Sequence, residues 1–171
     1  VKTVFNNKTE KIKVVEKKAF SKGPRAAVNC YGADNVPEGV AVIYSQTFNN
    51  CKSLASVRLP EGLTEIGSNA FSSCSALAEI NIPGTVTLIS GNAFAHCTGL
   101  KEIHLPESMY RIDVEAFSHC TNLATVTMPK TLTTLGKGVF SYCSALTGIT
   151  VPEGVTELGD KMFYECALLK Q

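Results

Sequence analysis

The sequence repeats itself every 23 residues, and this period constrains the possible folds more than any other feature of the chain. Four residue types mark the repeat, each at its own position in every unit. The markers are Pro37, Pro60, Pro83, Pro106, Pro129 and Pro152; Phe48, Phe71, Phe94, Phe117, Phe140 and Phe163; Cys51, Cys74, Cys97, Cys120, Cys143 and Cys166; and Leu54, Leu77, Leu100, Leu123, Leu146 and Leu169. Such a period predicts a row of equivalent coils that each contact only their neighbours, which is a solenoid.

Residues 60–82 show what one coil contains. Ile80 and Ile82 alternate with polar residues, which is the pattern of a half-buried strand. Pro83 ends this strand because proline has no N–H to donate to a ladder. Stacked coils would place equivalent strands about 4.8 Å apart in a parallel sheet. The Leu63–Ile66 stretch fits a second short extended segment.

The rest of the coil is predicted to turn back toward the next strand. Gly67 permits a turn, and two other units also have Gly at this position. Ser68 and Asn69 are suited to cap one short helical turn that carries Phe71. A single coil leaves both of its flat faces in water and has no ladder partner, so we expect each coil to need neighbours in order to fold.

The stretch 59–77, LPEGLTEIGSNAFSSCSAL, resembles the unit of the BspA-like leucine-rich repeat family. That unit has a Pro after a strand, two spaced aliphatic residues, an Ile-Gly turn, an Ala-Phe pair, then Cys and Leu. The resemblance implies an α/β-type repeat: a right-handed leucine-rich repeat solenoid with a parallel β-sheet on one face and short helical turns and coil on the other. The departures from the pattern are Ser90 and Asp113 at the turn Gly, and Thr47, Val139 and Met162 at the Ala before Phe.

The repeats divide the chain into two parts. Residues 37–171 form the array, with about six units of which the last is incomplete. In residues 1–36 the pattern is out of phase, since Phe20 lies 28 residues before Phe48. We interpret residues 1–36 as a diverged N-terminal repeat that caps the array. A terminal coil needs a polar outer face, and residues 1–25 hold eight of the sixteen Lys and Arg residues.

The cysteines invite a disulfide or zinc interpretation, but their spacing does not favour one. They occur once per coil, without the Cys-x-x-Cys pairs typical of zinc sites. Neighbouring Cys residues would have Cα atoms about 4.8 Å apart, which is compatible with a disulfide. We favour small buried apolar residues that fill one recurrent niche. Cys30 is out of phase and is the best candidate for a reactive thiol.

His96 and His119 occupy the same position in neighbouring units, about 5 Å apart in the expected stack. A metal pair or a pH-sensitive spot is an alternative at this position. The adjacent Cys side chains are expected to point inward while the His side chains point outward, so the four side chains would not converge. We therefore predict no metal site.

Charge and motifs favour a non-enzymatic protein. The net charge of +1 gives no reason to expect nucleic acid or acidic membranes as partners. No stretch approaches the roughly 20 apolar residues of a membrane span. The sequence contains no phosphate-binding loop, nucleophile elbow or His-Glu-x-x-His motif. We expect no catalytic residues, no cofactor and no membrane insertion.

The outward positions of the strand form two ladders along the predicted sheet, where repeat proteins usually bind their partners. These positions vary from unit to unit, although any solvated face shows such variation. The candidate partner-binding residues are Ser56, Arg58, Glu79, Asn81, Glu102, His104, Thr125 and Thr127.

The function that we predict is protein binding by a non-enzymatic scaffold. The family resemblance implies a more specific form, a cell-surface or secreted adhesin-like protein whose partner is a host or extracellular-matrix protein. Two alternatives stay open, a structural spacer and an accessory domain of a larger surface protein.

Overall fold

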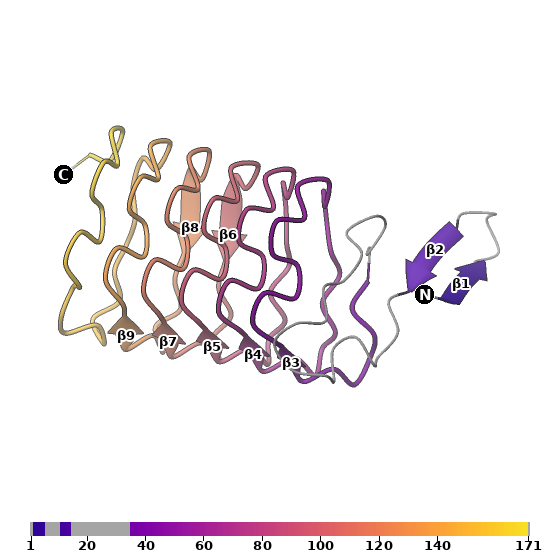
Figure 1. Cartoon of the computed structure of the whole chain (residues 1–171). Helices are drawn as coiled ribbons and strands as arrows, with labels where there is room; N and C mark the ends of the chain where they lie inside the picture. The colour runs from indigo at the N-terminus through magenta and orange to yellow at the C-terminus, as the bar shows by residue number, and fades with distance from the viewer. Residues whose placement is uncertain (1, 6–10, 15–34, 171) are drawn as a thin grey trace.

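The chain is a stack of coils. The computed structural model describes residues 2–5, 11–14 and 35–170. From residue 35 onward the coils lie side by side in one row (Figure 1). Equivalent residues of neighbouring coils pair in parallel, as Glu65 does with Leu88 and Ile66 with Ile89. The predicted solenoid is therefore confirmed.

Three small sheets are present in the described residues. A five-stranded parallel sheet runs along one edge of the stack, and a two-stranded parallel sheet lies on another side of the coils (Figure 1). The five strands are β3 (Val42–Ile43), β4 (Glu65–Ile66), β5 (Leu88–Ile89), β7 (Arg111–Ile112) and β9 (Thr134–Leu135). The two-stranded sheet contains β6 (Glu102–His104) and β8 (Thr125–Thr127). The third sheet is an antiparallel pair, β1 (Lys2–Phe5) and β2 (Lys11–Val14).

The two predicted extended segments differ in regularity. The segment predicted at Leu63–Ile66 and its equivalents in other coils form the five-stranded sheet. The segment predicted at Ile80–Ile82 forms regular strands only at the equivalent positions β6 and β8. Between the two preceding coils, the extended segments are joined near their start by one backbone hydrogen bond, from the N–H of Ala78 to the carbonyl of Ala55. The alternation of side chains still holds, because Ile80 is buried and Asn81 is exposed.

A ladder of phenylalanines forms the axis of the core. Phe71 and Phe94 stack with ring centroids 5.2 Å apart and planes 3° apart, and the rings of Phe94 and Phe117 have the same spacing and tilt. Each of these three rings has no exposed surface. The aligned row is the arrangement that the 23-residue period predicts, and it seals the interior of each coil with the next.

The segment that carries each Phe is a run of turns, so the prediction of a short helical turn is wrong. Asn69 and Ser73, two residues before and after Phe71, have left-handed φ angles of 56° and 62°. The N–H groups of Asn69, Phe71 and Ser73 donate to carbonyls of the next coil at 2.7–3.0 Å. An α-helix directs its N–H groups along its own axis, so bonding between coils replaces the helix.

Gly67 is needed for a close approach of two coils. A Cβ at Gly67 would lie 2.6 Å from the carbonyl oxygen of Ile43, and a Cβ at Gly159 would lie 2.8 Å from that of Gly136. Gly67 is not among the residues with positive φ. The sequence therefore identified the right residue for a different reason, because the backbone of the preceding coil leaves no room for a side chain.

The ladder cysteines from Cys51 to Cys143 are buried, as predicted, while Cys166 is partly buried. The thiols from Cys74 onward also donate hydrogen bonds. The thiol of Cys97 donates to the carbonyl oxygen of Phe71 at 3.1 Å, and Cys74 donates to Phe48 at the same distance. Burial raises the pKa of the Cys74 thiol to about 12. Within residues 35–170 the free thiols are Cys74, Cys97, Cys120, Cys143 and Cys166. Cys51 differs from the predicted pattern, because it is disulfide-bonded.

The β1–β2 pair lies within the segment 1–36 that the sequence assigns to an N-terminal cap. Most of this segment, including Phe20 and Cys30, lies outside the described residues. The capping role therefore stays a prediction.

Candidate functional site

The candidate site lies on the side of the coils that carries β6 and β8. Alternation along each extended segment buries Val57, Ile80 and Ile103 in the core. The residues on either side of them face solvent. All eight candidate residues are exposed: Ser56, Arg58, Glu79, Asn81, Glu102, His104, Thr125 and Thr127.

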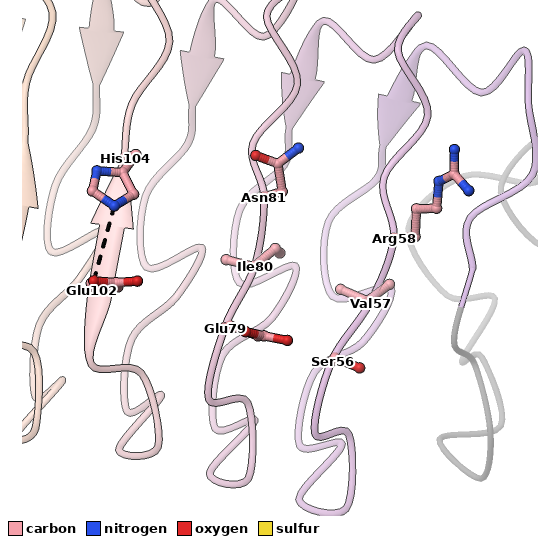
Figure 2. Close-up of a pocket in the computed structure, with 8 residues that line it drawn as sticks. All are labelled: Ser56, Val57, Arg58, Glu79, Ile80, Asn81, Glu102 and His104. Atoms are coloured by element: carbon pink, nitrogen blue, oxygen red, sulfur yellow. Dashed lines mark ion pairs between the residues drawn. The ribbon is translucent and has the colours of Figure 1, made fainter.

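Six of these residues line one shallow groove of about 470 Å³. The lining is Ser56, Val57, Arg58, Glu79, Ile80, Asn81, Glu102 and His104 (Figure 2). Val57 and Ile80 are not among the predicted site residues because their positions face the core, yet both contribute apolar surface to the groove. Thr127 lines a second hollow of about 500 Å³ farther along the stack, and Thr125 lines neither.

The groove has two rows of polar side chains that run across three neighbouring coils. Figure 2 shows Ser56, Glu79 and Glu102 in one row. It shows Arg58, Asn81 and His104 in the other. The rows are two residues apart along each strand, so both sets of side chains point to the same face. The first row carries the carboxylates of Glu79 and Glu102. The second row carries the guanidinium of Arg58, the amide of Asn81 and the imidazole of His104.

Few interactions hold these side chains to one another. Nδ1 of His104 lies 3.1 Å from Oγ1 of Thr127. Nε2 of His104 lies 4.0 Å from Oε2 of Glu102, with the two side chains 66% and 62% exposed. An ion pair so exposed contributes little to stability, even when the imidazole is protonated. Among the residues that the structure describes, neither Arg58 nor Glu79 forms an ion pair.

The predicted neighbours His96 and His119 lie on a different surface and form part of an aromatic stack. Their ring centroids are 4.4 Å apart with planes 14° apart. Tyr142 extends the stack, 4.1 Å from His119. Tyr142 occupies the same repeat position as His96 and His119, so the 23-residue spacing was a signal that could have predicted its place in the stack. Partial burial and the neighbouring imidazole of His96 lower the pKa of His119, while Glu115 opposes this effect.

No cluster of three or more His, Cys, Asp or Glu side chains within the described residues could hold a metal ion. The same part of the chain contains no helix with the length and apolarity needed to cross a bilayer.

Comparison with known proteins places this architecture in a family. The sequence matches the BspA type leucine rich repeat region, in six copies, over residues 13–143 and 64–171. A search of curated proteins gave no significant match.

Three solved structures share the fold. A leucine-rich repeat protein from Bacteroides ovatus ATCC 8483 is 36% identical with a TM-score of 0.76, and the match covers 80% of this chain and 35% of that one. The leucine-rich repeat protein of T. pallidum is 34% identical with a TM-score of 0.77, covering 79% and 65%. A leucine rich cell surface protein from Faecalibacterium prausnitzii A2-165 is 27% identical with a TM-score of 0.54, covering 80% and 52%.

The chain therefore spans about a third to two thirds of the length of these similar proteins. The family match covers far more than half of the sequence, and the coils have the predicted parallel stacking. The protein belongs to the BspA type leucine-rich repeat family.

Proposed function

We propose that this chain is a non-enzymatic scaffold that binds a protein partner through the groove. Leucine-rich repeat families commonly mediate protein interactions. The observation that carries the proposal is the grouping of six exposed polar side chains around one groove on a stack of sealed coils. Side chains on a rigid support lose less freedom on binding than the same groups on a mobile loop.

The proposal extends to where the protein acts. One of the similar structures is described as a leucine rich cell surface protein. This similarity supports action at the cell surface or after secretion. We further propose an adhesin-like role, with a host or extracellular-matrix protein as the partner, which the resemblance to the BspA-like family implies.

The test uses the purified 171-residue chain and a panel of immobilised extracellular-matrix glycoproteins, with binding measured by biolayer interferometry. We expect at least one glycoprotein to bind. A variant with Arg58→Ala, Glu102→Ala and His104→Ala should weaken this binding at least tenfold.

The chain offers a matched control variant with the same residue types on other surfaces. Arg111→Ala, Glu115→Ala and His96→Ala together remove one Arg, one Glu and one His outside the groove. This control should bind as the parent chain does. Binding that both variants retain, or an absence of binding to the whole panel, would contradict the proposal and favour a structural spacer.

A further inference from the structure

The charged side chains of the groove belong to two parallel rows (Figure 2). Glu79 and Glu102 occupy equivalent positions in neighbouring coils, and Figure 2 shows them in the same row. Arg58 lies in the other row, on the coil before that of Glu79 (Figure 2). The groove therefore presents two neighbouring carboxylates in one row and a guanidinium in the other row, one coil away.

These charges do not stabilise the fold. Glu79 and Glu102 carry like charges at equivalent positions of neighbouring coils, and like charges that face each other do not stabilise a structure. Within the described residues, Glu79 has no cationic partner, and Glu102 has only His104 at 4.0 Å. Arg58 likewise has no carboxylate partner in this part of the chain. The groove thus presents charges that a partner of complementary charge would neutralise.

We propose that the groove binds an extended peptide segment of a partner protein that carries a Lys or Arg and, two residues away, an Asp or Glu. The basic side chain pairs with Glu79 and Glu102, and the acidic side chain pairs with Arg58. This inference rests on the proposed function and names the chemistry of the partner.

Strand geometry sets the spacing of the two charges in the partner. The rows of the groove are separated by two residues, about 6.6 Å along an extended chain. An extended peptide has the same separation between side chains at positions i and i+2, which point to one face. Arg58 also lies one coil, about 4.8 Å, to the side of Glu79, an offset that long side chains such as Lys and Glu can span. A peptide that crosses the coils obliquely therefore brings charges at i and i+2 to Glu79 and Arg58 at once, whereas charges at i and i+1 point to opposite faces.

The experiment selects from a phage library of random twelve-residue peptides on the immobilised chain. Phage that bind a variant with Glu79→Gln and Glu102→Gln are removed first. We expect the enriched peptides to share a basic and an acidic residue two positions apart. A synthetic copy of the most enriched peptide, measured by fluorescence polarisation, should bind the variant at least threefold more weakly. Moving its acid by one position should weaken binding to a similar degree.

Thermal unfolding of the Glu79→Gln, Glu102→Gln variant shows whether weaker peptide binding comes from the lost carboxylates or from a destabilised fold. Because the two carboxylates are exposed and repel each other, the variant should unfold at the same or a higher temperature than the parent chain. Enriched peptides without the paired charges, or no enrichment, would overturn the inference. A glycoprotein that binds both the parent chain and the Glu79→Gln, Glu102→Gln variant equally would overturn it while leaving the proposed function intact.

Discussion

The thiol of Cys97 combines two roles that different substitutions separate. It is fully buried, and it donates a hydrogen bond to the carbonyl of Phe71. The same carbonyl also accepts the N–H of Cys74 at 3.1 Å, so it stays paired when the thiol is removed. Cys97→Ser keeps a second donor, whereas Cys97→Ala removes it and adds a small cavity. We therefore expect Ala to lower the free energy of unfolding more than Ser does, by about 1 kcal/mol.

Urea unfolding followed by circular dichroism measures this difference. If the thiol is only a small apolar residue, the order reverses, because Ser then buries a hydroxyl without benefit. Burial raises the pKa of Cys143 to about 12, as it does for Cys74, so these thiols stay protonated and able to donate throughout the neutral pH range.

Gly67 and Gly62 lie in one coil, and we expect substitution by alanine to affect stability differently at the two positions. A Cβ at Gly67 would lie 2.6 Å from the backbone oxygen of Ile43, and a Cβ at Gly62 would have no atom within 4 Å. Gly67→Ala should lower the free energy of unfolding by about 2 kcal/mol or more, because neighbouring backbones must move apart. Gly62→Ala should leave it unchanged or raise it by up to about 1 kcal/mol. Equal losses at the two positions in urea unfolding would contradict the close approach of coils.

The ring stack of His96, His119 and Tyr142 joins three neighbouring coils, and we expect it to make the free energy of unfolding depend on pH. The pKa of His119 is lowered from 6.5, so the folded state binds fewer protons than the unfolded state. Stability is then fully present above pH 6.5 and falls as the pH drops through 6.5 toward the lower folded-state pKa. His119→Tyr introduces the residue type of Tyr142 at the equivalent position and removes this titration.

Thermal unfolding at pH 7.5 and pH 5.0 tests the prediction. The decrease in melting temperature on acidification should be smaller for His119→Tyr than for the parent chain. His104→Tyr serves as a control on another surface, and its decrease should match that of the parent chain. An unchanged decrease in the His119 variant would assign the pH dependence to other groups.

The sequence predicted the period of these elements better than their local conformation. Positions that face the core, such as Ile80, and those that line the groove, such as Asn81, follow from alternation combined with the repeat. The left-handed turns do not, since residues as different as Glu115 and His119 adopt them. Asn69, Asn92 and Gly138 are residue types that favour this conformation, but Glu115 and Lys161 adopt it at the equivalent position. Hydrogen bonds between coils therefore impose it even where the residue type does not indicate it. The volume of the groove likewise depends on the spacing of three coils.

At the scale of the whole molecule, each coil is stabilised by its two neighbours. The ring of Phe94 stacks between those of Phe71 and Phe117, whereas Phe163 stacks on Phe140 at 6.2 Å and is only partly buried. Phe94→Ala should lower the free energy of unfolding by about 3–5 kcal/mol. Phe163→Ala in the same chain should lower it by less than half as much, because less contact area is lost. Urea unfolding of the two variants provides the comparison, and similar losses would argue against nearest-neighbour stabilisation.

The same reasoning connects stability to binding. The groove extends over residues 56–104, and the ring of Phe94 lies in the coil that also carries Glu102 and His104. A change at Phe163 acts on coils that contribute no side chain to the groove. The Phe163→Ala variant should therefore bind the selected peptide with the affinity of the parent chain at temperatures where both are folded. Its unfolding temperature should nevertheless be lower than that of the parent chain. Hydrogen exchange should show faster opening near Phe163 and unchanged protection near Ile80. A loss of peptide affinity in this variant would mean that the coils communicate beyond their nearest neighbours, because two coils separate the altered coil from the groove.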